Sequence, residues 1–377
     1  MIGDGGQGYR LTKSGYGTVL LNVANTYSGG TTVAAGTLRV GNAGALGSGS
    51  ITMEGGSLDA ASALTLAGSP SQVWAGNFGY AGTNTLNVGT GPVSLTGSRT
   101  VTVSGSTLTV GGVISATDPA YALTKAGAGT LALSGNNTYS GGTVLSGGVL
   151  SFGAGGLGTS GPITVSGNAT LQWATSNTAD ISGRLVVADA VTVSLDPQAN
   201  NVMLASGIAG GPTSNVVKLG AGTLKISGAS SFGGSVTLGN TVGVLNVQHP
   251  MALGTGSSVV TTGTGASAVE LQGNVTVAGR TLAAASAVRN ASGVNTWGGP
   301  VTHSAAVTYT STAGMLYFTS ASGVTATNTV GFTGSGGVSF DGPIETTAAV
   351  SNSLAAGLYL NASSGFSGTM TNSGGFT

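Results

Sequence analysis

Between residues 123 and 143 the chain reads Leu123-Thr124-Lys125-Ala126-Gly127-Ala128-Gly129-Thr130-Leu131, then Asn137-Thr138-Tyr139-Ser140-Gly141-Gly142-Thr143. The same two phrases occur at 11–18 and 25–31, and in looser form at 218–224 and 232–234. A worn fourth copy near 358–370 keeps Leu358, Leu360 and Phe366. Repetition of this kind indicates stacked structural units that bury their faces against their neighbours.

The spacing within the phrases is constant. The aromatic residue follows the lysine by fourteen positions in three copies (13 to 27, 125 to 139, 218 to 232). A further phrase, Leu46-Gly47, Leu157-Gly158 and Leu253-Gly254, follows the same lysines by 33, 32 and 35 positions (46−13, 157−125, 253−218). The lysines themselves are 112 and 93 residues apart (125−13, 218−125), which indicates blocks of four or five coils.

Apolar residues alternate with small polar ones in short runs such as Val101-Thr102-Val103, Ile163-Thr164-Val165 and Val275-Thr276-Val277. Each run ends at Gly, Asn or Ser, which is typical of short β-strands separated by tight turns. No stripe of helical period is present. We therefore expect an all-β, right-handed parallel β-helix (β-solenoid) with little or no helix. At about 20 residues per coil, the chain makes roughly 16–18 coils.

The whole chain, 1–377, is expected to form a single continuous solenoid, because no linker or shift in composition interrupts it. Repeat copies are placed near 11–38, 123–150, 217–245 and 358–370. Residues 279–330 fit the pattern worst, and we expect an irregular coil or a protruding loop there.

The composition excludes several classes of protein. Charged residues are only 5% of the chain, and the ten basic and ten acidic residues give zero formal net charge. No basic patch for nucleic acid is therefore expected. Cysteine is absent, so neither disulfides nor thiolate metal sites can form. Mean hydropathy is +0.33, which argues against disorder. No apolar run is long enough for a transmembrane segment.

The phrases resemble the passenger-associated transport repeat, also called the autotransporter-associated β-strand repeat, whose pattern is close to LxKxGxGTLxLxxxNTYSGGTTVxxGTL. Residues 11–38 and 123–150 match nearly every fixed position, and residues 217–245 match with two inserted residues. The resemblance implies a bacterial protein that is extracellular or exposed at the cell surface and folded as a parallel β-helix. Neither a signal peptide nor the strands of a translocator barrel are recognisable in this sequence, so we expect both to be absent from this chain.

Fifteen positions define the repeat and are interpreted as structural. The lysines are expected at strand edges beside the Gly-x-Gly turn, with their stems over apolar surface; the alternative is a row of basic anchors for acidic glycans. The aromatics are expected to stack on a neighbouring coil; the alternative is a platform for sugars. The fifteen positions are Lys13, Gly15, Gly17, Tyr27, Gly29, Lys125, Gly127, Gly129, Tyr139, Gly141, Lys218, Gly220, Gly222, Phe232 and Gly234.

No constellation of catalytic or metal-binding residues stands out, so neither a catalytic residue, a metal nor a cofactor is predicted. Asp180, Asp189 and Asp196 are the best candidates for paired carboxylates, but their spacings of nine and seven are shorter than a coil. The simpler interpretation is that they are turn residues facing water. The two histidines, His249 and His303, have no acidic ligand spacing beside them.

Three functions follow in order of preference. The first is a non-enzymatic structural protein of the bacterial exterior that self-associates into a homopolymer through solenoid ends or lateral faces, since neither end of the sequence looks capped and charge is low. The second is an adhesin-type rod binding a surface glycan or receptor through 279–330, with Trp297 and Arg289 as anchors. The third is a polysaccharide-degrading enzyme with a groove lined by Asp180, Asp189 or Arg184.

Overall fold

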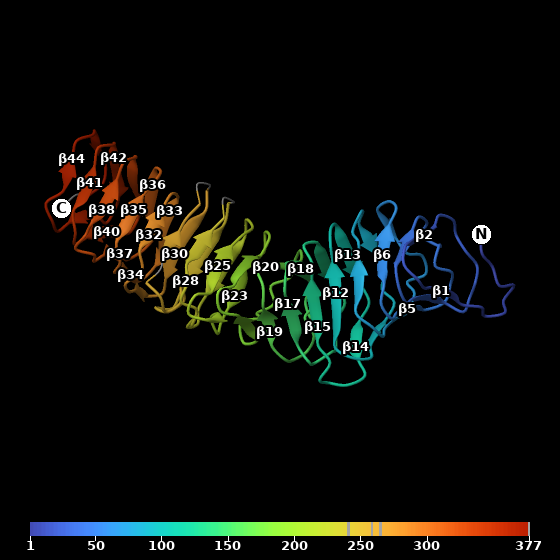
Figure 1. The fold of residues 1–377 in the computed structure, drawn as a ribbon. Helices are drawn as coiled ribbons and strands as arrows, with labels where there is room; N and C mark the ends of the chain where they lie inside the picture. Colours follow the sequence, from blue (N-terminus) through green and yellow to red (C-terminus); the bar gives the residue numbers. More distant parts are fainter. Residues whose placement is uncertain (240–241, 258, 264–265, 376–377) are drawn as a thin grey trace. The chain divides into compact units, whose positions relative to one another are not determined.

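The computed structural model describes residues 1–239, 242–257, 259–263 and 266–375. Within these residues all regular elements are short β-strands, no helix forms, and the paired strands run parallel. The expected fold is confirmed, since the strands stack as a β-solenoid of about 17 turns (Figure 1). In the described part of the chain, no helix is long and apolar enough to cross a membrane.

The chain forms two compact units: Met1–Ala179 with Arg184–Val186, and Asp180–Gly183 with Val187–Thr377. Strands of the first unit form three parallel stacks, which we call A, B and C; the short β21 (Leu185–Val187) has residues in both units. Stack A contains β1 (Leu11–Lys13), β3 (Thr31–Val33), β5 (Ile51–Met53), β8 (Gln72–Trp74), β11 (Val93–Leu95) and β14 (Ile114–Ala116). Stack B contains β2 (Thr18–Leu21), β4 (Thr37–Val40), β6 (Ser57–Ala60), β9 (Phe78–Tyr80), β12 (Arg99–Val103), β15 (Leu123–Ala126), β17 (Thr143–Leu145) and β19 (Ile163–Val165). Stack C contains β7 (Leu64–Thr65), β10 (Leu86–Asn87), β13 (Thr107–Val110), β16 (Thr130–Leu133), β18 (Gly148–Phe152) and β20 (Ala169–Trp173).

Strands of the second unit form three stacks, which we call D, E and F, and this unit also contains the short strand β24 (Ala209–Gly210). Stack D contains β22 (Thr192–Asp196), β25 (Asn215–Lys218), β27 (Val236–Leu238), β29 (Val260–Thr261), β32 (Leu282–Ala284), β35 (Val301–His303), β38 (Val324–Ala326), β41 (Ile344–Thr346) and β44 (Gly365–Phe366). Stack E contains β23 (Val202–Leu204), β26 (Thr223–Ile226), β28 (Val244–Val247), β30 (Ala268–Gln272), β33 (Ala287–Ser292), β36 (Val307–Ser311), β39 (Val330–Gly334), β42 (Val350–Leu354) and β45 (Met370–Asn372). Stack F contains β31 (Thr276–Val277), β34 (Val294–Trp297), β37 (Met315–Phe318), β40 (Gly337–Phe340) and β43 (Leu358–Leu360).

Parallel register places like residues on like residues. Leu108, Leu131, Leu150 and Leu171 are successive partners in stack C, and all four are buried. Neighbouring strands lie about 4.8 Å apart, so each leucine packs on the one below it. The alternation seen in the sequence thus becomes continuous inward rows and outward rows of threonine and serine.

Residues 279–330 differ from the expectation of an irregular coil or protruding loop. They contain β32 to β38 in regular register, with Leu282 opposite Val301 and Val301 opposite Val324. One irregularity falls inside the stretch: Leu271 pairs with Asn290 but Gln272 pairs with Ser292, so Ala291 of β33 is skipped in the register with β30. The stretch stays regular because valines still recur at the inward positions, although the fixed phrases of the repeat are lost.

Each repeat copy covers two turns rather than one. Its lysine strand pairs with a strand twenty residues later, as Lys125 with Leu145, and its second strand pairs with the next one along, as Thr130 with Val149. The remaining side of both turns has no strand: residues 134–142 and 153–162 are turns and extended chain. The Asn-Thr-Tyr and Leu-Gly phrases lie on this strandless side.

Candidate functional site: buried lysines and stacked aromatics of the repeat

The three repeat lysines point into the solenoid. Lys13, Lys125 and Lys218 are only 6, 0 and 2% exposed. Lys125 occupies the inward row between Val101 and Leu145, which are its register partners. The lysines lie at strand ends beside the Gly-x-Gly turn, and their side chains are directed inward. A row of basic anchors for acidic glycans is excluded by this burial.

Each ammonium is held by backbone carbonyl oxygens, an arrangement we call the lysine cage. Lys125 Nζ donates to the oxygens of Ala126 (2.8 Å), Gly127 (2.7 Å) and, one turn later, Gly147 (3.1 Å). Three acceptors match the three N–H donors of an ammonium. The other two cages are built alike: Lys13 donates to Ser14, Gly15 and Ala35, and Lys218 to Gly220 and Gly222.

The glycines of the phrase make the cage possible. Gly127 has φ of +79°, a left-handed conformation that turns its carbonyl toward the lysine. At Gly129 an added Cβ would lie 1.6 Å from the oxygen of Gly105 in the turn below, so no side chain fits. The equivalent approaches occur at the paired glycines, where a Cβ on Gly29, Gly141 or Gly234 would lie 2.1, 2.4 or 2.3 Å from a backbone oxygen. Gly15, Gly17 and Gly220 have positive φ, and Gly222 is as tightly packed as Gly129.

Burial removes water from around the ammonium, and the hydrogen bonds of the cage offset only part of the lost hydration free energy. Desolvation lowers the pKa of Lys125 to about 8, and that of Lys218 also to about 8, with Asp196 opposing the shift at Lys218. Both lysines therefore stay protonated at neutral pH. The buried charge is tolerated because backbone carbonyl oxygens accept its N–H groups, three at Lys125 and two at Lys218.

The aromatics of the phrase fill the strandless side. The Tyr139 ring is buried beneath Gly158 of the next turn, where an added Cβ would be 2.9 Å from its Cε2 atom. Its hydroxyl is 2.7 Å from Thr143 Oγ1, which donates to the oxygen of Leu157 (3.2 Å). Tyr27 repeats the arrangement with Thr31. The rings thus stack on a neighbouring coil, and a sugar platform is excluded.

Asparagine completes the strandless side. Asn137 accepts a hydrogen bond from the Ile114 amide in the turn before (2.8 Å) and donates to the Gly156 oxygen in the turn after (2.6 Å). Asn25 bridges its turns in the same way. In the third copy Ser230 takes this role, accepting from Ile208 and donating to Ala252. One side chain therefore supplements the backbone bonds that remain between turns on this side, such as those from Thr138 to Ile114 and from Thr159 to Tyr139.

Phe232, the aromatic of the third copy, has no hydroxyl. The buried guanidinium of Arg280 lies 5.8 Å from its ring centroid, within cation–π range, and donates to the Gly234 oxygen (3.3 Å). Desolvation lowers the pKa of Arg280 to about 10. Of the fourth copy, Leu358 is buried in β43, while the side chain of Phe366 lies outside the described side chains.

Within the first unit the two copies do not lie on one side of the solenoid. Lys13 is in stack A, whereas Lys125 is in stack B. Their separation of 112 residues is therefore not a whole number of turns. The buried lysines of the two copies therefore lie in different stacks, and the repeats do not form a continuous surface feature.

The candidate aspartates each cap a turn. Asp180 accepts hydrogen bonds from Ser182 and, one turn on, from the amide of Ala205. Asp189 accepts two from Thr213, which lower its pKa. Asp196 is held by Gln198. Asp180 and Asp189 are exposed and fit the simpler interpretation of turn residues facing water, whereas Asp196 is buried at the end of β22 and does not face water.

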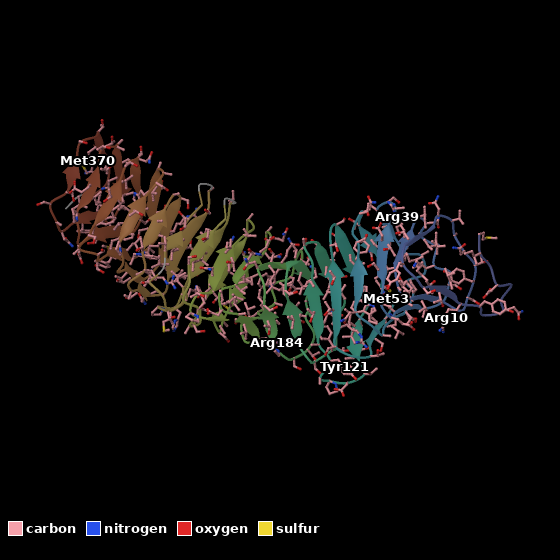
Figure 2. The ribbon with its side chains drawn as sticks, viewed as in Figure 1. Arg10, Arg39, Met53, Tyr121, Arg184 and Met370 are labelled. Atoms are coloured by element: carbon pink, nitrogen blue, oxygen red, sulfur yellow. The ribbon has the colours of Figure 1, made fainter. Side chains whose placement is uncertain are left out.

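Arg184, labelled in Figure 2, is also engaged with the backbone. Its guanidinium donates to the oxygens of Leu157, Gly158, Ser160 and Gly161 at 2.7–2.9 Å. This clamps the Leu-Gly turn that covers Tyr139. The same atoms could not also serve a substrate without releasing that turn.

The histidines are not brought together with acids. His249 Nδ1 accepts a hydrogen bond from the Met251 amide (3.0 Å). His303 is buried, its Nε2 lies 2.6 Å from the Tyr309 hydroxyl, and desolvation lowers its pKa to about 4. Among the described residues, no group of three or more His, Cys, Asp or Glu side chains could hold a metal.

The two expected anchors of a binding loop, Trp297 and Arg289, differ in exposure. Trp297 is buried, and its indole N–H donates to the Arg280 oxygen (2.9 Å), so it cannot contact a ligand. Arg289 is part-exposed on the outer face of β33. What sequence reasoning missed was the inward direction of the lysines and the bridging role of Asn137. The Asn-Thr-Tyr phrase, identical at 25–27 and 137–139, was the available signal, because an outward asparagine would have no reason to be repeated.

One family model, described as passenger-associated-transport-repeat, matches residues 11–40, 123–152 and 216–247. These segments begin at the lysine strand and end in the second turn of each copy. No curated protein and no solved structure matches the chain. The chain is thus a parallel β-solenoid with three segments that match the passenger-associated-transport-repeat model, each a two-turn module closed over a buried lysine.

Proposed function

We propose that this chain is a non-enzymatic structural protein of the bacterial exterior, a β-solenoid building block that self-associates into a filament, tube or surface layer. The passenger-associated-transport-repeat and the solenoid fold support an extracellular or cell-surface location. The interior of the repeat supports a structural role, since its lysines, tyrosines and asparagines all bond to the chain itself.

The observation that carries self-association is the removal of charge from the surface. Seven of the 20 charged side chains are buried, which leaves 13 over an accessible surface of 13,623 Å². Copies of such a molecule repel one another weakly, and low net charge promotes association. The buried set is Asp4, Lys13, Asp59, Lys125, Asp196, Lys218 and Arg280.

The outward rows offer surfaces for packing. On stack B, Thr100, Thr124, Val144 and Thr164 follow one another in register. Their methyl and hydroxyl groups form an uncharged ribbon that a second copy can contact without desolvating charge. Lateral packing of such ribbons is the association that we favour.

Electron microscopy with sedimentation of the purified protein tests this function. We expect regular filaments, tubes or sheets from the natural chain. A triple variant, Thr52→Lys, Thr109→Lys and Thr124→Lys, places a charge on each stack of the first unit and should stay dispersed at low salt, with assembly recovering as salt screens the charge. Serine at the same positions is the matched control. A natural chain that remains a monomer at high concentration would refute the proposal.

An adhesin-type rod is the second candidate. The loss of Trp297 as an anchor weakens its original form, but one observation favours it. Lys225, Glu270 and Arg289, three part-exposed charges of this charge-poor chain, lie on one outer face of the second unit. A surface that concentrates charge in such a protein is suited to binding a ligand.

A further inference from the structure

The outer face of stack E carries an ordered row of side chains. Met203, Lys225, Asn246, Glu270 and Arg289 are successive register partners on β23, β26, β28, β30 and β33. Elsewhere the outward rows are mostly threonine and serine, with Arg39 and Asp59 on stack B as another charged pair in register. Its chemistry belongs to the second candidate function and does not depend on self-association.

A groove of about 320 Å³ lies in this row, and its lining includes Met203, Thr223, Lys225, Asn246, Glu270 and Gln272. Lys225 and Glu270 are two turns apart, which places their backbones about 10 Å from each other. The short side chain of Asn246 stands between two long ones. The groove therefore has a floor at Asn246 and part-exposed walls at Lys225 and Glu270.

The floor is buried and incompletely bonded. Asn246 is 2% exposed, and its Nδ2 donates to Glu270 Oε1 (2.5 Å) and Gln272 Oε1 (3.2 Å). Gln248 donates to the same Gln272 oxygen (2.6 Å), which fixes that amide too. Because Nδ2 faces the turn of Glu270, Oδ1 faces the turn of Lys225. Oδ1 accepts no hydrogen bond from the described residues, and a buried acceptor left this way is costly.

The walls keep polar groups available for a ligand, although Glu270 Oε1 already accepts a hydrogen bond from Asn246. Lys225 makes no hydrogen bond or ion pair with any described residue. Arg289 follows Glu270 in register, yet the ion pair in the described part of the chain joins Arg39 and Asp59 instead. The groove thus presents an ammonium donor, a carboxylate acceptor and, when the wall side chains move apart, a floor acceptor.

A ligand for this groove must accept from Lys225, donate to Glu270 and donate to Asn246. Sugar hydroxyls do both, since each has one donor and two acceptor lone pairs. An acidic ligand would meet the carboxylate of Glu270, and a cationic one would meet Lys225 and Arg289. We infer that the groove between Lys225 and Glu270 binds one sugar unit of a neutral glycan.

Titration of the intact chain with defined oligosaccharides tests the inference. The neutral probes are hexasaccharides of glucose, mannose and N-acetylglucosamine; the acidic probes are oligogalacturonate and hyaluronan hexasaccharide. Lys225→Met keeps the stem and removes the ammonium, and Glu270→Gln keeps the shape and removes the charge. Because charge-assisted bonds are lost, each should weaken neutral-sugar binding about tenfold or more. Glu54→Gln, exposed in the first unit, should leave affinity unchanged.

The outcomes separate cleanly. Binding of at least one neutral probe, weakened in both groove variants and not in the control, supports the inference. Binding of acidic probes alone, binding that both variants retain, or no binding of any probe overturns it. Unchanged unfolding midpoints would show that the exposed substitutions leave the fold intact. Electron microscopy of Lys225→Met reports assembly separately, so failure of self-association and failure of glycan binding remain distinguishable.

Discussion

Two regions of this protein fill the same narrow kind of interior by opposite means. The repeat at residues 123–152 has strands on two sides, and its interior holds an ammonium, an amide and a phenol hydroxyl, all hydrogen-bonded. Residues 297–340 have strands in three stacks, and their interior holds rings. Phe318 stacks on Phe340 at 4.6 Å, and Tyr309 stacks on Phe332 at 5.3 Å.

The difference follows from backbone hydrogen bonding. A strand satisfies the N–H and C=O groups of its neighbours, so the space inside can be wholly apolar. Where a side lacks a strand, buried backbone groups must find side-chain partners. The repeat phrase is thus a way of closing a solenoid turn without a third strand.

The aromatic interior should show the largest effect. Phe340→Ala removes a ring that packs against Phe318, Tyr309 and Phe332, and it should lower the free energy of unfolding by about 3–5 kcal/mol. Denaturant titration followed by Trp297 fluorescence measures this loss. Asp341→Asn, exposed beside it, is the control. A loss below about 1 kcal/mol would show that the rings are not closely packed.

The second prediction removes the ammonium from the lysine cage of the polar interior. Lys125→Met leaves three buried carbonyl oxygens with one partner fewer and should cost about 2–4 kcal/mol in the first unit. Unfolding followed by the fluorescence of the buried Trp173 reports it. Thr124→Ala, which points outward on the same strand, should cost less than about 0.5 kcal/mol. Equal costs for the two variants would contradict the cage.

The stability of the aromatic interior should fall in acid, because this interior contains the buried His303. The folded pKa of His303, about 4, lies below its unfolded value of 6.5, so only the unfolded state gains a proton as pH falls through this window. Stability contributed by neutral His303 is complete above pH 6.5 and is lost toward pH 4, by about 1.5 kcal/mol between pH 6.5 and 5. His303→Phe should remove that part of the pH slope. An unchanged slope in the variant would rule out His303 as its source.

The smallest expected loss of stability comes from removing the tyrosine hydroxyl, which the third repeat copy lacks. Tyr139→Phe removes the hydroxyl beside Thr143, but Thr143 keeps its bond to Leu157, so we expect a cost of about 1 kcal/mol. Phe232 shows that a copy can form without this hydroxyl. Tyr16→Phe, fully exposed, is the control for chemical unfolding. If Tyr139→Phe lowers the free energy of unfolding by more than about 3 kcal/mol, the hydroxyl matters more than its contacts indicate. Arg280 would then have to make up for the missing hydroxyl of Phe232 in the third copy.

Much of the fold was predictable from local pattern. Alternation in runs such as Val101-Thr102-Val103 gives strands, and the repeat gives stacking, so the solenoid and its number of coils were confirmed. The candidate site was harder. Alternation did place Lys125 on the inward face of its strand, but the general rule that lysine stays outside argued against it. Only the carbonyls of Gly127 and Gly147, brought together by two turns, show why the rule fails there.

By itself, the sequence determined that the chain is all-β, that its strands are short and stacked, and that it bears few charges. These properties depend on residue type and on intervals of two and about twenty residues, which can be read directly from the sequence. The tertiary structure alone decided that residues 279–330 are regular, that Trp297 is hidden, and that Lys225, Asn246 and Glu270 share one groove. Those facts depend on register between turns, because residues about 20 positions apart become neighbours only when the chain has wound once around.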